Sequence, residues 1–461
     1  MHHSTPRRDL WSVIRRKLEL ASPVMIGLAA GVSMNFIDTV MAGRLPDRQV
    51  ALAALATGGA LWSAMLMITL GLLMAVQPSV AQLDGAGRHE EAGAVTRQGF
   101  WIAAALGLPF FLVIFNGGRL LGWLAVDPQI IPTASAYLGA LAWGAPMFCL
   151  MLLLRFYSEG SGHTRPTMYI GILGALLNVP LNWVLMFGNL GFPALGARGC
   201  GYATSIVMSL QALAMFLYVR RHAHYRPFRL LARWDAPDPV EIRRLLRIGA
   251  PIAGTLFVEA SLFIAASLLI GRLGPTLTAG HLVAINYSAL VFMIPLGLGS
   301  AVTTRVGNAL GRNDPAGARH AGLVGLGLVM CTQLLSATVM LTIPGAIVAI
   351  YTDDAAVAAV AVSLLFYAAL FQIPDGLQIC SAAILRGYKD TLVPMMINVL
   401  SYWMVGLTLG YYLTFHREWG PAGMWTGMIA GLTVGAALMT VRFLRLGGRL
   451  MRADPAPAPV R

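Results

Sequence analysis

Long apolar runs separated by short polar segments make up almost all of this chain. A helix needs roughly 20 apolar residues to cross a bilayer core about 30 Å thick. Gly and Pro recur inside the runs, which is typical of membrane helices and argues against a lipid-facing β-barrel. The pattern therefore predicts an all-α, polytopic membrane protein with about twelve transmembrane helices, near residues 18–43, 50–81, 94–116, 130–157, 165–187, 199–219, 246–270, 278–308, 318–341, 356–385, 391–414 and 422–444.

Composition supports a membrane protein. The 461 residues are 57% hydrophobic and 11% charged, whereas soluble domains are about 25% charged. Segment 1–17 is basic but has no apolar core ending in a small-residue cleavage site, so we expect the first span to be retained. The four cysteines form no CxxC pair, which indicates neither a disulfide framework nor a metal site.

The basic charge predicts the orientation. A net charge of +13 can indicate nucleic-acid binding, but here the charge lies between the spans. If both termini are cytoplasmic, all but six of the 33 Lys and Arg residues lie on the inner side. The positive-inside rule therefore predicts cytoplasmic termini, and no nucleic-acid partner. The six outer residues are Arg44, Arg48, Arg119, Arg198, Arg272 and Arg417.

The chain also repeats itself. A shift of 228 residues places Pro23 on Pro251, and the GRL of 43–45 on the GRL of 271–273. This predicts two parallel six-helix pseudo-repeats related by an axis along the membrane normal. We expect a cytoplasmic N-terminal segment (1–17), a first lobe (18–220), a basic cytoplasmic linker (221–245), a second lobe (246–446) and a cytoplasmic tail (447–461).

Three carboxylates interrupt the apolar runs: Asp38, Glu259 and Asp375. A charged acid near the bilayer centre costs at least about 2.5–3.5 kcal/mol. Such acids usually serve proton relays, cation sites or pockets for cationic substrates. The alternative is a structural acid kept neutral beside a hydroxyl or an amide.

Amides accompany the first acid. Asn35 lies one helical turn before Asp38, on the same face, and Asn178 and Asn182 share a face around Pro180. Such amides can supply donors and acceptors to a buried acid. Alternatively, they join helices by interhelical hydrogen bonds.

Polar groups accompany the other two acids. Asp375 follows Pro374, and Gln372 and Gln378 lie three residues to either side of it. Thr255 precedes Glu259 by one turn. Proline frees a backbone carbonyl, and oxygen-rich, kinked backbone suits a hard cation or a proton relay.

Other polar residues have simpler interpretations. Asp353 and Asp354 open the tenth span on the outer side, where they either complement the helix dipole or attract cations to an acidic entrance. Arg155 precedes Glu159 by one turn, which predicts an ion pair. His281 has no ligand-like spacing, so we interpret it as core packing.

Motifs of common enzymes are missing. The chain contains no GxxxxGK[ST], HExxH or GxSxG. No soluble segment is long enough to hold an enzyme site. We therefore expect a protein that moves its substrate unchanged.

Five segments resemble the MATE (multidrug and toxic-compound extrusion) family, and its NorM-type bacterial branch in particular: MNFIDTVMAG (34–43), EGSGHTRPTM (159–168), LNVPLNWVL (177–185), IPDGLQ (373–378) and LRGYKDT (385–391). The resemblance implies two six-helix lobes around a central cavity. It implies a monomer in the bacterial inner membrane that exports cationic, amphipathic drugs and dyes. Na⁺ or H⁺ is then the coupling ion, with no further cofactor.

The resemblance also implies roles for residues. Asp38, Glu259 and Asp375 match coupling acids, and Glu259 with Asp375 matches a Na⁺ site. The Asp38 position, with Asn178 and Asn182, is tied to protonation and substrate handling, and the Asp353–Asp354 position to substrate contact. Phe371 departs from the pattern, because it offers no oxygen four residues before Asp375. The alternative is a flippase for a lipid-linked intermediate, which predicts a basic cavity instead of acidic buried charges.

Overall fold

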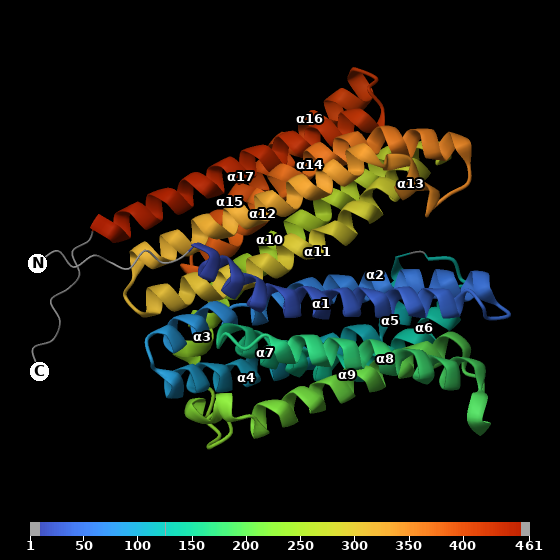
Figure 1. The fold of residues 1–461 in the computed structure, drawn as a ribbon. Helices are drawn as coiled ribbons and strands as arrows, with labels where there is room; N and C mark the ends of the chain where they lie inside the picture. Colours follow the sequence, from blue (N-terminus) through green and yellow to red (C-terminus); the bar gives the residue numbers. More distant parts are fainter. Residues whose placement is uncertain (1–9, 125, 453–461) are drawn as a thin grey trace, which may run out of the picture. The chain divides into compact units, whose positions relative to one another are not determined.

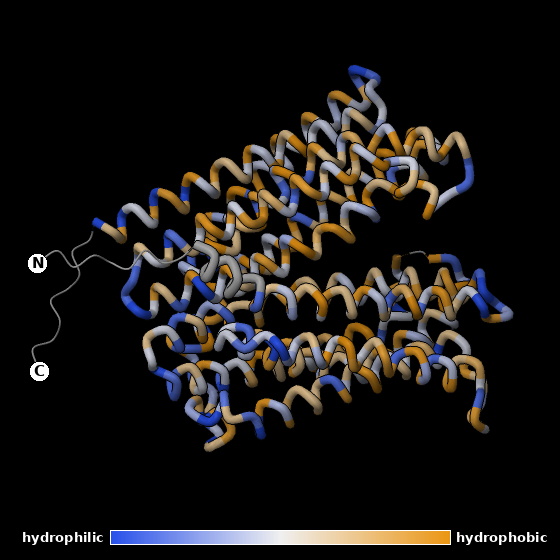
Figure 2. Tube along the Cα trace, viewed as in Figure 1, coloured by the Kyte–Doolittle hydropathy of each residue, from blue (hydrophilic) through white to orange (hydrophobic). Residues whose placement is uncertain are grey.

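The computed structural model describes residues 10–124 and 126–452, and it is helical throughout apart from short turns and loops (Figure 1). Figure 2 shows apolar residues along the helices and polar residues gathered at the loops. The predicted all-α, twelve-span protein is confirmed, because twelve segments are long and apolar enough to cross a membrane: Glu19–Ala42, Arg48–Gly85, His89–Phe115, Ile131–Gly160, Arg165–Phe187, Gly196–Arg221, Pro239–Gly271, Pro275–Gly311, Pro315–Thr342, Ala355–Gly387, Leu392–His416 and Pro421–Arg452.

The first compact unit comprises residues 23–253. Within it α8 and α6 pack on α9, and α4 packs on α7. Pro146 lies in the first turn of α7, after a 3₁₀ turn. The helices of this unit are α1 (Leu10–Ala42, from Pro23 onward), α2 (Arg48–Leu73), α3 (Val76–Gly85), α4 (His89–Phe115), α5 (Gly117–Trp123), α6 (Ile131–Leu141), α7 (Ala145–Gly160), α8 (Arg165–Phe187), α9 (Gly196–Arg221) and the beginning of α10 (Pro239–Gly271).

The second unit comprises residues 254–461 together with the chain before Pro23. Its central helix is α14, which packs against α11, α12 and α17 and carries Asp375. After the remainder of α10, the helices are α11 (Pro275–Gly311), α12 (Pro315–Thr342), α13 (Pro344–Ala349), α14 (Ala355–Gly387), α15 (Leu392–Asn398), α16 (Thr408–Tyr411) and α17 (Pro421–Arg452).

The eleventh span is not a uniform α-helix. It contains two stretches of π-helix, Val399–Leu407 and Tyr412–His416, on either side of α16. Glycines line its contact with α17, and a Cβ on Gly427 would lie 2.3 Å from the Cα of Gly410. Small residues allow this close approach of two membrane helices.

The linker belongs to the first unit. The compact unit that contains the linker extends to Ala253, inside α10. The physical reason is that residues 223–238 fold onto the first unit, where Tyr225, Phe228 and Leu230 are buried. The start of α10 is therefore held with this linker.

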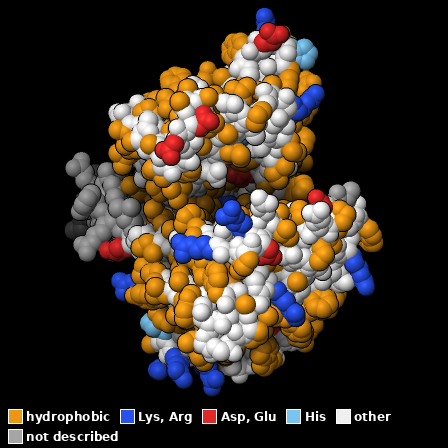
Figure 3. All heavy atoms as spheres, turned by 90° about the vertical axis from the view of Figure 1, so that its right-hand side faces the viewer, with side chains coloured by type: hydrophobic (Ala, Val, Ile, Leu, Met, Phe, Trp, Pro, Cys, Tyr) orange, Lys and Arg blue, Asp and Glu red, His pale blue; other side chains and the backbone are white. Residues whose placement is uncertain are grey.

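The flanks of the units are apolar. Phe36, Phe257 and Leu268 are among many large hydrophobic side chains that are more than half exposed. Figure 3 views the loop ends of the helices, where charged side chains lie among the apolar ones, whereas the exposed apolar residues named above lie along the helices. Such a surface suits contact with lipid tails.

We expect Gly427→Ala to lower the thermal unfolding temperature of the purified protein. The added methyl group meets backbone atoms of Gly410 and Gly406 that cannot move aside, and overpacking costs about 1–3 kcal/mol. Gly139→Ala is the matched control, because its Cβ meets nothing within 4 Å. Equal unfolding temperatures for the two variants would contradict the close packing of α17 on this span.

Three histidines attach the start of the linker to the first unit. His163 shares a hydrogen bond of 3.0 Å with Tyr218, and its ring lies 4.8 Å from each of the rings of His222 and His224. Burial, followed by the charges of His224, His222 and Arg165, lowers the pKa of His163 to about 4. Burial also lowers the pKa of His224.

Acid should weaken this cluster. The pKa of His163 is lower in the folded protein than its ordinary value of 6.5, so its stabilising contribution is complete above pH 6.5 and is lost as the pH falls toward about 4. Unfolding temperatures measured between pH 7.5 and 4.5 should fall less steeply in His163→Gln than in the wild type. The exposed His416→Gln should follow the wild type. Parallel curves for all three proteins would rule out this role of His163.

Candidate functional site

Asp38 lies at the centre of a polar site inside the first unit. Its side chain on α1 is 6% exposed. The amide nitrogens of Asn178 and Asn182 on α8 donate to its Oδ1, over 3.0 and 2.6 Å. The Thr204 hydroxyl on α9 donates to its Oδ2 over 3.2 Å. Two helices, α8 and α9, thus bring polar groups to one carboxylate on α1.

Glycines bring α1 close enough to α8 for these bonds to form. A Cβ on Gly171 would lie 2.9 Å from the Cα of Gly27, and a Cβ on Gly27 would lie 2.8 Å from the carbonyl oxygen of Thr167. The two backbones therefore touch near this point. Asn178 and Asn182, one turn apart on α8, can then both reach the same oxygen of Asp38.

The hydrogen bonds match an ionised carboxylate, because every partner donates to it. The side-chain oxygens of Asn178 and Asn182 are buried, and neither has a hydrogen-bond partner among the described residues. A proton on Asp38 needs an acceptor, and rotation of one amide would present such an oxygen to it. The site can thus serve either protonation state with the same residues.

Asn35 is not part of this network. Its side chain is exposed, and its recorded hydrogen bond is made by its backbone carbonyl, which accepts from the Thr39 hydroxyl. We expected Asn35 on the same face of α1 as Asp38. A step of three residues turns a helical side chain by about 60°, and this leaves Asn35 outside the buried site.

A second acidic site lies within the other unit. Asp375 on α14 is 2% exposed, and no group in residues 10–124 and 126–452 hydrogen-bonds to its Oδ1. Glu259 on α10 is near enough to act on it electrostatically. Both acids are also near enough to Tyr402 to act on it electrostatically, and Arg386 is near enough to Glu259 to do the same. The two predicted acids are therefore brought together.

The two glutamines beside Asp375 bond elsewhere. Gln372 accepts from the amide of Gln333 on α12 over 2.7 Å, and Gln378 donates to the Asn398 side chain on α15 over 3.2 Å. Each thus ties α14 to a neighbouring helix, as interhelical amides do in membranes.

Several oxygens near the second site are free to accept. Among the described residues, Asp375 Oδ1, Gln378 Oε1 and the Tyr402 hydroxyl are buried without a hydrogen-bond partner. An unsatisfied buried polar atom is costly. Oxygen donors of this kind fit a hard monovalent cation or a proton, whereas the described residues contain no His, Cys, Asp and Glu cluster suited to a transition metal.

The outer acids have a structural task. Asp354 is the N-cap of α14, and its Oδ1 accepts from the backbone amides of Ala356 and Val357 over 2.8 and 3.1 Å. Asp353 is exposed beside it. The dipole interpretation therefore has direct support for Asp354.

Two other expectations can be compared with contacts. The predicted ion pair of Arg155 with Glu159 is confirmed, at 2.7 Å. His281 is more than packing, because the Trp425 indole donates to its Nδ1 over 3.2 Å while its Nε2 lies 3.0 Å from the Ser267 hydroxyl. It links α10, α11 and α17.

Sequence reasoning missed partners that come from distant helices. Thr204 is one of many threonines in apolar runs, and only the packing of α9 brings it to Asp38. Arg386 was counted as a topology charge, yet it is buried. The remaining missed residues are Gln333, Asn398 and Tyr402, whose position on spans was the only available signal.

Comparisons with known proteins agree with this architecture. The sequence pattern of the MatE family matches twice, at residues 23–184 and 251–412, which is the predicted shift of 228 residues. The multidrug resistance protein PmpM of Pseudomonas aeruginosa is 41% identical over 97% of this chain and 96% of its own length.

Two further matches extend the comparison. The probable multidrug resistance protein NorM of Xanthomonas campestris pv. campestris is 43% identical, over 95% of each chain. The crystal structure of the eukaryotic MATE transporter AtDTX14 covers 96% of this chain and 98% of its own, with a TM-score of 0.84 at 19% identity. At that identity the structural match establishes the fold.

Removing one amide donor should impair function without unfolding the protein. We expect Asn182→Ala to reduce transport by roughly tenfold, because a hydrogen bond to a charged group contributes about 1.5–3 kcal/mol. Efflux rates are compared at equal protein abundance. Ser209→Ala is the control, because its hydroxyl bonds only to a carbonyl of its own helix. Unchanged efflux in Asn182→Ala would mean that this hydrogen bond is not needed for function.

Proposed function

The chain belongs to the MatE family, and we propose that it is a secondary antiporter that exports cationic, amphipathic drugs and dyes in exchange for Na⁺ or H⁺. The relatives named as multidrug resistance proteins support export of varied small molecules. The proposal places the protein as a multi-pass protein in a bacterial inner membrane, and the charge asymmetry supports cytoplasmic termini.

The single observation that carries the proposal is the Asp38 site. A carboxylate buried among apolar helices and held by three donors can gain or lose one positive charge at little structural cost. A proton and a cationic substrate are both attracted to such a group. Competition between them is a direct way to couple uptake of one to release of the other.

The second acidic site supplies a place for the coupling ion. Asp375 and Glu259 provide negative charge, and Tyr402 and Gln378 provide oxygens, which together replace the oxygen that Phe371 does not offer. Binding of an ion there neutralises repulsion between the two acids. A ligand shifts a conformational equilibrium only by its different affinities for the two states, so alternating access requires that ion and drug favour opposite states.

The flippase alternative lacks this support. A lipid-linked pyrophosphate calls for a basic binding site. Asp38 instead meets neutral donors from Asn178, Asn182 and Thr204.

Transport under imposed gradients tests the proposal. Efflux of a fluorescent cationic dye is followed in membrane vesicles with a Na⁺ gradient or a pH gradient applied alone. We expect at least one gradient to drive efflux, and Asp38→Asn, Glu259→Gln and Asp375→Asn to reduce it by tenfold or more. Glu418→Gln, which alters an exposed acid outside the candidate sites, should retain efflux.

The pattern of losses identifies the ion. Efflux driven by Na⁺ and lost in Glu259→Gln and Asp375→Asn assigns a Na⁺ site to the second unit. Efflux driven only by a pH gradient and lost in Asp38→Asn assigns protonation to the first. Absence of dye efflux under both gradients, with wild-type protein present in the vesicles, would refute the drug-export proposal.

A further inference from the structure

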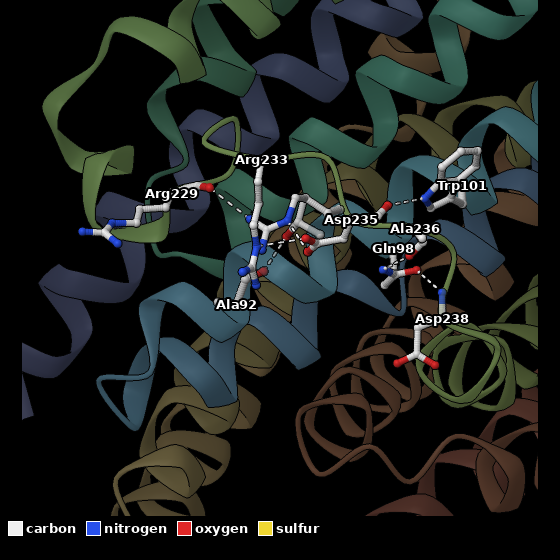
Figure 4. Close-up of polar contacts among 10 residues, drawn as sticks. Ala92, Gln98, Trp101, Arg229, Arg233, Asp235, Ala236 and Asp238 are labelled. Atoms are coloured by element: carbon white, nitrogen blue, oxygen red, sulfur yellow. Dashed lines mark hydrogen bonds and ion pairs between the residues drawn. The ribbon is translucent and has the colours of Figure 1, made fainter.

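The second half of the linker, residues 229–238, is a folded strap that lies along α4. The guanidinium of Arg97, which is 5% exposed, pairs with Asp235 at 2.5 Å and donates to the Arg229 carbonyl over 2.9 Å. Figure 4 shows Arg229, Arg233 and Asp235 of the strap beside α4. A buried arginine with two partners on the strap fixes it more firmly than a surface ion pair does.

Further along, α4 holds the strap by its next polar residues. Gln98 donates to the Ala236 carbonyl over 3.0 Å and accepts from the Asp238 backbone amide over 2.8 Å. The Trp101 indole donates to the Asp235 carbonyl over 3.0 Å. Backbone groups of the strap are thus satisfied by α4, so the strap does not need water for them (Figure 4).

These contacts place the strap at the level where α4 enters the hydrocarbon region. The helix carries polar and charged residues up to Gln98 and is apolar from Phe100 to its end at Phe115. Trp101, which is 43% exposed, lies at this transition. Tryptophan is enriched at membrane–water interfaces for the same reason, because its ring is apolar and its N–H is polar.

The strap adds a second tryptophan at that level. Trp234 is 77% exposed, and its ring lies 5.9 Å from the ring of Phe100. Exposure of so large an aromatic side chain is unfavourable for a loop that is surrounded by water. At the headgroup level the same side chain can insert beside lipid.

The surrounding charge is strongly positive. Eight arginines and three acids lie between residues 220 and 247. Asp235 also pairs with Arg233 at 2.9 Å, and Glu241 pairs with Arg244. Five exposed arginines have no ion-pair partner in the part of the chain that the structure describes: Arg220, Arg221, Arg226, Arg243 and Arg247.

We propose that the strap is a binding surface for anionic phospholipid headgroups. Trp234 of the strap inserts at the interface. Arg233 of the strap and Arg226, which precedes the strap, bind the lipid phosphate. The charge, the interfacial level and the exposed tryptophan all favour a headgroup, whereas a free phosphate would satisfy only the charge. The proposal does not depend on which ion drives transport.

Native mass spectrometry with added lipid tests the proposal. Purified protein is titrated separately with phosphatidylglycerol, cardiolipin and phosphatidylcholine. We expect the anionic lipids to bind more tightly than phosphatidylcholine. The double variant R233Q/W234A should lose about fivefold or more of that preference, since one arginine near an anionic surface contributes a factor of about five.

The control has the same composition at another place. R417Q/W419A also removes one exposed arginine and one exposed tryptophan, between α16 and α17, and should keep the wild-type preference. Hydrogen exchange of residues 229–238 checks that the strap stays folded, because Arg97 and Asp235 are unchanged. If R233Q/W234A loosens the strap, the single Arg226→Gln, which alters an exposed side chain outside residues 229–238, should still weaken anionic lipid binding.

Three results would overturn the proposal. Equal binding of phosphatidylglycerol and phosphatidylcholine by the wild type is the first. Wild-type lipid preference in both R233Q/W234A and Arg226→Gln is the second. The third is displacement of bound lipid by inorganic phosphate when chloride at equal ionic strength does not displace it. That result would assign the surface to free phosphate.

Discussion

Burial of a negative charge among apolar helices is the constraint on which the rest of this structure depends. An ionised carboxylate is very costly to bury unless it is paired or hydrogen-bonded. Asp38 meets that requirement with donors from α8 and α9, so its state fixes how those helices must meet α1. Asp375 meets it only in part, because its Oδ1 has no hydrogen-bond partner among the described residues. The first site is therefore satisfied as an anion, and the second is better suited to a group that arrives from outside.

Close helix contacts are what make these sites possible. Side-chain amides and hydroxyls are short, so the helices that carry them must approach within a few ångströms of each other. Glycines permit this approach at Gly27 and Gly171, about three turns along α1 from Asp38, and at Gly410 and Gly427 in the other unit. Many other large apolar side chains are exposed along the helices, where lipid tails can surround them.

The linker also pairs its polar groups within the protein, near the membrane boundary. Its strap satisfies its backbone through Arg97, Gln98 and Trp101 of α4, in place of water. That contact moves the unit boundary into α10 and makes the linker a part of the first unit. A connecting segment of this kind is a folded element with a surface of its own.

The sequence by itself determined the twelve spans, the two repeats and the three acids within the spans. Apolar length and internal similarity are properties of the chain that do not require knowledge of packing, and the family pattern recurs at the same shift. Helical spacing also determined that Asn178 and Asn182 share a face. Only the tertiary structure decided which groups meet across helices: Thr204 joins Asp38, Gln372 and Gln378 turn to Gln333 and Asn398, and Asp354 caps α14. The physical reason is that a helical period gives the direction of a side chain about its own axis, whereas its partner depends on which other helix packs there and at what height.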